Sequence, residues 1–198
     1  MEQSNQINSG NNRREIIIKK YLLSSWEFIK IIIIALIIVL PIRYFLFQPF
    51  IVKGDSMVPN FHSGDYLIVD EISYRMKNPQ RGDVIVLKYP RDLSQRFIKR
   101  VIGLPGETVN VKDGKIIIYK DGKILNLDEK NYLPDLKNTE GNINTILADN
   151  EYFVLGDNRQ YSYDSRSWGI LPREDIIGRA LLRIFPVTKI TYISGFSY

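Results

Sequence analysis

The chain has 198 residues, a formal net charge of +5, one histidine and no cysteine. Its length and composition, with 44% apolar and 25% charged residues, fit one globular domain with an anchor. The basic residues are scattered among acidic ones, which argues against nucleic-acid binding. The lack of cysteine excludes disulfides, and a single histidine, His62 in a predicted turn, argues against a zinc site or a Ser-His-Asp triad. We therefore expect no metal and no cofactor.

A membrane-length apolar stretch lies near the N-terminus. Only Lys30 and Arg43 are charged from residue 28 to residue 47, and a helix of that length spans about 30 Å, the thickness of the hydrocarbon core of a bilayer. A buried core helix would carry a polar face, and a cleaved secretory signal would have a shorter apolar region that ends at small residues. The pattern predicts an uncleaved transmembrane anchor over residues 26–47.

The flanking charges predict the orientation of this anchor. The predicted tail of residues 1–25 begins with a polar stretch at 1–12 and includes two arginines and two lysines, at positions 13, 14, 19 and 20. The positive-inside rule places such an end in the cytoplasm. We expect a single-pass protein of the cell membrane, with the lipid bilayer as a partner and residues 48–198 outside the cytoplasm.

Residues 48–198 consist of short apolar runs separated by turns, with Asp-Gly at 113–114 and 121–122. Many short strands joined by such hairpin signals predict a mainly β, extracytoplasmic catalytic domain. Residues 112–150, rich in Asn, Asp and Lys, are interpreted as a small insertion made of a hairpin and a loop. The predicted strands cover 66–69, 83–88, 97–102, 108–111, 115–119, 151–155, 179–185 and 190–193.

Ser56 and Lys99 are candidates for a nucleophile and its base. Ser56 lies in the turn Gly-Asp-Ser-Met-Val-Pro at 54–59, and a serine hydroxyl needs a base to become an effective nucleophile. Lys99 lies in Phe-Ile-Lys-Arg-Val-Ile at 97–102, where alternation places it on the apolar face of a strand. Such a lysine is either buried and held neutral, or points to solvent from an edge strand. The local pattern leaves both interpretations open.

A third segment, GDNRQYSYDSRSWG at 156–169, follows an apolar strand-like run and is dense in hydrogen-bonding groups. Asp164 and Arg166 are spaced to pair with each other or with Arg100. By itself this segment predicts either a polar, salt-bridged turn or the support of an active site.

Taken in order, the anchor, these segments and Arg-Gly-Asp-Val-Ile-Val at 81–86 resemble bacterial type I signal peptidases, also called leader peptidases. The resemblance implies a core of antiparallel β-sheets, shared with the self-cleaving repressors of the DNA-damage response. The anchor and the lack of a helix-turn-helix pattern disfavour the repressor branch. The implied activity is that of a serine endopeptidase that removes signal peptides from secretory preproteins after small residues at −3 and −1.

The resemblance also implies roles for single residues. Ser56 would attack the scissile carbonyl carbon, Lys99 would be the general base, and Ser162 would orient the lysine amine. The backbone N–H of Ser56 would be one oxyanion donor. Gly54 stands where many relatives carry a serine, so the second donor stays open. Supporting charges would come from Asp164, Arg166 and Arg100.

Substrate recognition is implied to occur by an extended peptide that adds to a sheet edge. Phe50 would contribute at −3. The −1 pocket would be lined by Val52, Met57, Phe61, Phe97 and Ile98. Ordinary hydrophobic core is the alternative role for these six side chains.

Two further hypotheses stay open. The chain is alternatively a specialised or catalytically silent homologue, or a membrane-anchored β-domain that binds a partner without catalysis. Substitution of Ser56 or Lys99 separates them, because only an enzyme loses its function with either residue.

Overall fold

The computed structural model describes residues 26–37, 39, 47–134 and 138–195. The chain divides into two compact units, Met1–Tyr44 and Phe45–Tyr198. In the first unit, residues 26–37 and 39 are helical. No helix among the described residues has the length and apolarity needed to cross a bilayer. The predicted anchor also includes residues 38 and 40–46, which lie outside the described residues, as does the predicted tail, and both stay predictions.

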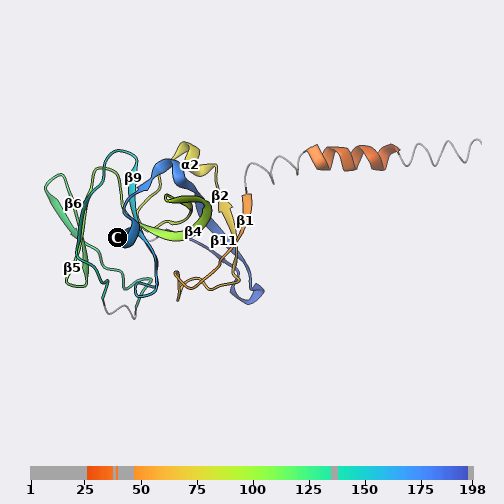
Figure 1. Ribbon diagram of the computed structural model, residues 1–198. Coiled ribbons are helices and arrows are strands. Elements are labelled where there is room, and N and C mark those ends of the chain that lie inside the picture. The colour runs from red at the N-terminus through yellow and green to blue at the C-terminus, as the bar shows by residue number, and fades with distance from the viewer. Residues whose placement is uncertain (1–25, 38, 40–46, 135–137, 196–198) are drawn as a thin grey trace, which may run out of the picture. The chain divides into compact units, whose positions relative to one another are not determined.

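The second unit consists mainly of antiparallel β-structure, as predicted. Its larger sheet has the order β1-β2-β11-β3-β4-β9-β10, and β12 pairs with β11. In Figure 1, β4 and β9 lie between the end formed by β1 and β2 and the end formed by β5 and β6. The strands of this sheet are β1 (Phe47–Ile51), β2 (Tyr66–Asp70), β3 (Val84–Tyr89), β4 (Asp92–Gly103), β9 (Glu151–Leu155), β10 (Leu171–Pro172), β11 (Ile176–Phe185) and β12 (Thr191–Tyr192).

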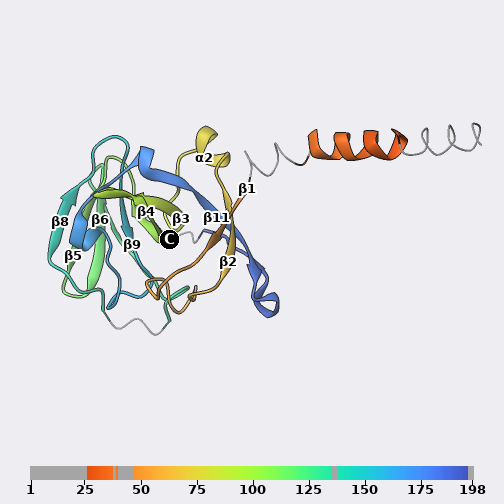
Figure 2. The ribbon, with the colours of Figure 1, turned by 45° about the vertical axis from the view of Figure 1, so that its right-hand side comes forward.

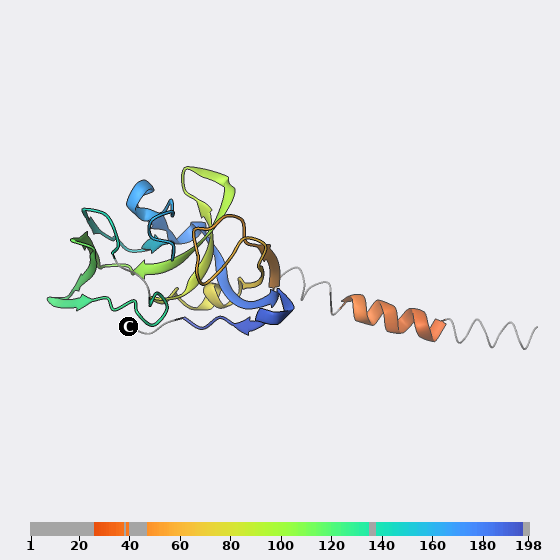
Figure 3. The same cartoon turned by 90° about the horizontal axis from the view of Figure 1, so that it is seen from below.

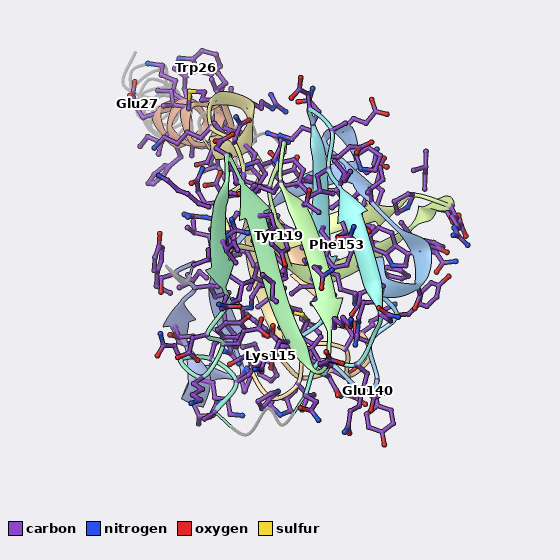
Figure 4. All side chains as sticks on the ribbon, turned by 90° about the vertical axis from the view of Figure 1, so that its left-hand side faces the viewer. Trp26, Glu27, Lys115, Tyr119, Glu140 and Phe153 are labelled. Atoms are coloured by element: carbon purple, nitrogen blue, oxygen red, sulfur yellow. The ribbon has the colours of Figure 1, made fainter. Side chains whose placement is uncertain are left out.

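A second sheet has the strand order β7-β6-β5-β8. Figure 2 shows it at the end of the unit opposite to β1 and β2, and Figure 4 views the unit from this end, with Tyr119 of β6 labelled. The predicted insertion at 112–150 is therefore more than a decorating hairpin, because it supplies three of the strands and shares a buried cluster with β9. The strands are β5 (Thr108–Lys112), β6 (Lys115–Lys120), β7 (Lys123–Asn126) and β8 (Ile143–Ile146).

Four strands lie outside the predicted ranges: β1, β7, β8 and β10. Strand β1 contains Pro49 and pairs only with β2, as suits an edge strand. Every residue of β7 is exposed, so it has no alternation of apolar and polar residues to reveal it. Strand β4 begins at Asp92 rather than at the predicted residue 97, because its polar first half pairs with β3 in a hairpin. Figure 3 shows this yellow-green hairpin projecting from the unit.

The short helices connect the strands and carry part of the candidate site. Helix α3 follows the loop after β9, and its N-cap residue, Asp164, accepts a hydrogen bond from the backbone N–H of Arg166. The helical elements of the second unit are α2 (Ser73–Met76), α3 (Ser165–Trp168), η1 (Arg173–Asp175) and η2 (Val187–Lys189).

Candidate active site

Ser56 lies on a tight turn that follows β1. The turn is closed by backbone hydrogen bonds from Val58 to Asp55, at 3.2 Å, and from Phe61 to Met57, at 2.9 Å. It begins at Gly54, whose φ of +81° lies in the left-handed region that favours glycine. Space next to this glycine is open, since a Cβ placed there would meet no atom within 4 Å. Ser56 itself is half-buried and belongs to the lining of a cleft described below.

Lys99 lies on β4 and reaches the serine. Its Nζ donates a hydrogen bond of 2.8 Å to the Oγ of Ser56. The residue is only 3% exposed, and its Nζ lies 5.4 Å from the centre of the Phe97 ring. At Lys99, strand β4 pairs with β3, and its pairing with β9 begins at the next residue. Of the two interpretations left open by the sequence, the structure has the buried lysine.

Burial lowers the pKa of Lys99 from 10.5 to about 8. The main cause is desolvation, because loss of water disfavours the ammonium more than the neutral amine. The carboxylates of Asp164 and Asp157 act in the opposite direction and raise the pKa, and the Arg166 guanidinium lowers it. A pKa of about 8 leaves a substantial fraction of neutral amine at neutral pH, which is the form able to accept a proton from serine.

The loop after β9 is hydrogen-bonded to the turn that carries Ser56. Asn158 donates two hydrogen bonds to it, each of 3.0 Å, from its backbone N–H to the Ser56 carbonyl and from its side-chain amide to the Asp55 carbonyl. Gly156 makes the close approach possible. A Cβ at this position would lie 2.4 Å from the Ser56 carbonyl oxygen and 2.1 Å from the Ser162 hydroxyl. Sequence reasoning missed Asn158, although it lies within the quoted third segment.

The predicted charge network is divided into two separate pairs. Asp164 accepts two hydrogen bonds of 2.9 Å from the guanidinium of Arg166. Arg100 makes its bidentate ion pair with Asp157, at 2.8 and 2.6 Å. Asp157 was not among the predicted residues. Arg100 lies on the opposite face of β4 from Lys99, so its partner comes from the first residues of the loop rather than from Asp164.

The Ser162 hydroxyl makes no hydrogen bond to the Lys99 amine in this structure. This hydroxyl is buried next to Gly156 and has no hydrogen-bond partner among the described residues. The hydrogen bond of the Lys99 amine goes to Ser56. The expectation that Ser162 directly orients this amine is therefore not met in this structure.

A cleft of about 580 Å³ opens between β1 and the first half of β4. Three of the six predicted pocket residues line it: Phe50, Phe97 and Ile98. The other three, Val52, Met57 and Phe61, lie in the buried cluster behind it and do not belong to its lining. Ser56 and Lys99 lie in the cleft wall, together with Pro49, Ile51, Lys53, Ser94, Gln95 and Arg96.

Both walls of the cleft present a strand edge. Strand β1 pairs with β2 on one side only. Residues 96–99 of β4 pair with β3, whereas β9 pairs only with residues 100–103. Among the described residues, no strand occupies the second edge of either segment. Unpaired N–H and C=O groups therefore face the cleft from both sides, which suits an extended peptide.

The antiparallel β-unit, with a serine hydroxyl bonded to a buried lysine, defines a candidate hydrolase of the class that uses lysine in place of histidine as base. Residues 25–185 match the family model described as signal peptidase, peptidase S26. The chain belongs to this family of serine peptidases, the type I signal peptidases.

Two curated relatives agree with this assignment, and one solved structure is similar to part of the chain. A probable signal peptidase I-1 from Synechocystis is 40% identical over 187 residues, which cover 88% of this chain and 92% of the relative. Signal peptidase I P from Bacillus subtilis subsp. natto is 36% identical over 84% of this chain and 92% of its own length. A crystal structure of a signal peptidase I from Enterococcus faecalis is 34% identical, with a TM-score of 0.43, and covers 52% of this chain and 97% of its own.

Proposed function

We propose that this chain is a membrane-anchored signal peptidase that cleaves secretory preproteins with Ser56 as nucleophile and Lys99 as general base. The observation that supports this most directly is the 2.8 Å hydrogen bond between the two side chains, made by a lysine whose pKa burial lowers to about 8. The mechanism needs both features, because a charged lysine cannot accept the serine proton.

The reaction has two halves. In the first, the neutral Lys99 amine takes the Ser56 hydroxyl proton while Oγ bonds to the scissile carbonyl carbon, and the resulting ammonium then gives this proton to the departing amine as the C–N bond breaks. In the second half, Lys99 takes a proton from water, whose oxygen attacks the acyl-enzyme. Transfer of this proton back to Ser56 Oγ releases the cleaved signal peptide as a carboxylic acid and regenerates the enzyme.

The oxyanion of each tetrahedral intermediate has one donor in the serine turn. The backbone N–H of Ser56 makes no hydrogen bond to another described residue, so it is available to the carbonyl oxygen. Gly54 offers no hydroxyl, and no second donor is assigned. Backbone donors of this kind stabilise the charge that develops in the transition state.

Selection for small residues follows from the apolar wall near Ser56. Phe97 and Ile98 bound the place proposed for the −1 side chain, and Phe50 bounds the −3 side chain. Val52, Met57 and Phe61 support this wall from the buried cluster, which fixes its shape. Ring and branched side chains that cannot move leave room for alanine but not for larger residues.

The proposed anchor at 26–47 would hold the enzyme in the membrane that also holds the signal peptide, with residues 48–198 outside the cytoplasm. Confinement of both partners to one bilayer raises their effective concentration.

The test is cleavage of a preprotein with alanine at −3 and −1 by the full chain in lipid vesicles, from pH 6 to 10. We expect wild-type activity to rise through about pH 8, and Ser56→Ala and Lys99→Ala to lose it by more than about a thousandfold while they stay folded. Lys123→Ala, which changes an exposed lysine on β7, is the matched control and should cleave normally. Normal cleavage by either active-site variant would refute the Ser–Lys assignment.

A further inference from the structure

One buried turn beside the second sheet contacts all three segments that form the candidate site. This turn, residues 129–133, is closed by backbone hydrogen bonds from Tyr132 and Leu133 to the Glu129 carbonyl. Glu129, Tyr132 and Leu133 are each less than 8% exposed. The turn belongs to the predicted insertion, for which the sequence suggested no part in the chemistry.

Glu129 grips the loop after β9. Both of its carboxylate oxygens accept hydrogen bonds from Arg159, at 2.5 and 2.6 Å. Arg159 also bonds Thr139, at 2.6 Å, and the Gly156 carbonyl, at 2.9 Å. Gly156 packs closely against the Ser56 carbonyl oxygen. The Glu129–Arg159 pair therefore holds the loop where it contacts the serine turn.

Tyr132 reaches the other two segments. Its carbonyl accepts a hydrogen bond of 3.0 Å from the side chain of Asn60, which lies in the turn that carries Ser56. The same Asn60 amide donates to Asp157 at 2.8 Å. The Tyr132 ring packs on the guanidinium of Arg100, with 4.2 Å between the guanidinium carbon and the ring centre. Arg100 is the neighbour of Lys99 on β4.

We propose that Glu129 and Tyr132 are positioning residues of the site: the 129–133 turn fixes the serine turn, the lysine strand and the loop after β9 against one another. This keeps Ser56 Oγ within hydrogen-bond distance of Lys99 Nζ and keeps water away from the amine. The inference rests on the proposed Ser–Lys function.

A stabilising role alone is a weaker explanation of this arrangement. A buried Arg–Glu pair contributes little net stability relative to apolar packing, since both charges lose their hydration. Such a pair does, however, fix geometry, because the planar guanidinium and the carboxylate meet in one orientation. Here that orientation is transmitted, through Tyr132 and Asn60, to the segments that carry the two proposed reacting groups.

The charges that act on Lys99 separate this role from a direct electrostatic one. Asp164, Asp157 and Arg166 influence its pKa, next to the dominant effect of burial, and Arg100 adjoins it on β4. Glu129 is not among these groups. Substitution of Glu129 therefore changes the Lys99 pKa through spacing and hydration, and added water raises it toward the ordinary value.

The experiment measures kcat, KM and the pH profile of preprotein cleavage by the full chain in lipid vesicles. Glu129→Gln keeps the shape but weakens the ion pair with Arg159. Tyr132→Phe keeps the ring and the carbonyl but removes the hydroxyl, which donates a hydrogen bond to Glu129 and accepts one of 3.3 Å from Arg159. We expect Glu129→Gln to lower kcat at pH 7 by about tenfold with KM changed less than about twofold. In the pH profile of this variant, the rise of activity on the acidic side should move to higher pH by about half a unit, with most activity recovered at pH 10. Tyr132→Phe should show the same changes in smaller size.

Glu107→Gln is the matched control, because Glu107 also makes a largely buried ion pair, with Arg81 at 2.7 and 2.9 Å. The Glu107 side chain otherwise bonds the backbone N–H of Leu104, beyond the end of β4, and Arg81 bonds β4 at the Ile102 carbonyl, away from Lys99. This control should lower stability similarly and leave the pH profile unchanged. A wild-type pH profile and kcat in folded Glu129→Gln would overturn the inference. Equal shifts in Glu107→Gln would overturn it as well, by showing a general effect of lost stability. Inactivity of the wild type would instead count against the proposed function itself.

Discussion

Lys99 and Arg100 are adjacent basic residues on β4, and both are almost fully buried. They differ in the partners of their side chains. Arg100 faces the interior, where Asp157 receives it with two hydrogen bonds and Gly82 accepts a third, of 2.9 Å. Lys99 faces the cleft, where its hydrogen bond goes to a neutral serine and no carboxylate of the described residues is within ion-pair distance. Arginine stays charged under these conditions, whereas lysine adapts by losing its proton.

The comparison separates two effects of burying a basic residue: Arg100 stabilises the structure, and Lys99 provides the chemistry. A paired guanidinium fixes the position of β4 against the loop after β9. The Lys99 amine has no carboxylate of the described residues in ion-pair contact, so burial of its charged form destabilises the folded state at neutral pH. The same burial lowers its pKa and makes the neutral amine available as a base. The two faces of one strand therefore predict opposite responses to substitution.

Lys99→Met should give the largest contrast. We expect activity to fall by more than about a thousandfold, while the free energy of unfolding at pH 7 increases by about 3 kcal/mol. This gain follows from a pKa of 10.5 in the unfolded chain and about 8 in the folded one, at about 1.4 kcal/mol for each unit. From pH 8 to 10.5 the unfolded chain binds more protons, so wild-type stability rises with pH and the advantage of the variant declines. Urea unfolding of the wild type and the variant in detergent, at pH 7 and at pH 10, measures the gain in stability and its decline with pH. An equal stability difference between the two proteins at both pH values would contradict a neutral lysine.

Asp157→Ala addresses the other face and should act mainly on stability. It leaves the Arg100 guanidinium buried without its carboxylate, which costs about 3–5 kcal/mol. Thermal unfolding of the full chain measures this loss. Asp157→Asn, which still accepts hydrogen bonds, should lose less. A melting temperature unchanged in Asp157→Ala would mean that Arg100 has an equivalent partner and that the contrast between the two faces is wrong.

Gly156→Ala tests the contact between the loop after β9 and the turn that carries Ser56. Its Cβ would lie 2.4 Å from the Ser56 carbonyl oxygen, and this backbone atom cannot move without moving the nucleophile. We expect a loss of about 1–3 kcal/mol in stability and of up to about a hundredfold in kcat, because small displacements of a reacting group are costly. Gly122→Ala, at an open turn between β6 and β7, should leave kcat unchanged. A normal kcat in Gly156→Ala would show that the loop does not position Ser56.

The sequence predicted the mainly β fold from short-range alternation and turn signals. It predicted the family from the ordered motifs, and the pairing of Ser56 with Lys99 from the resemblance that these motifs carry, because the local pattern alone left the burial of Lys99 open. It could not predict the partner of Arg100, since Asp157 and Asp164 lie in the same polar segment and only the tertiary path of the loop decides between them. Nor could it assign Glu129 to Arg159, because charged residues in an Asn- and Lys-rich segment are usually solvated. Val52, Met57 and Phe61 were placed in the cleft by analogy, and apolar side chains carry no signal that separates a pocket wall from the core behind it.

Asp164→Asn should have the smallest effect, and it sharpens the account of Lys99. The carboxylate of Asp164 raises the Lys99 pKa, against the larger lowering by burial. Removal of this charge lowers the pKa further, so the acidic limb of the cleavage profile moves to lower pH and activity below pH 7 rises relative to the plateau. The two carboxylate oxygens of Asp164 accept separately from the backbone N–H groups of Arg166 and Gly156, and Asn keeps one acceptor oxygen, so it retains one of these two hydrogen bonds and some stability should be lost. A limb displaced to higher pH would mean that loss of the Arg166 pair admits water to the amine, and that Asp164 acts on Lys99 through packing rather than through its charge.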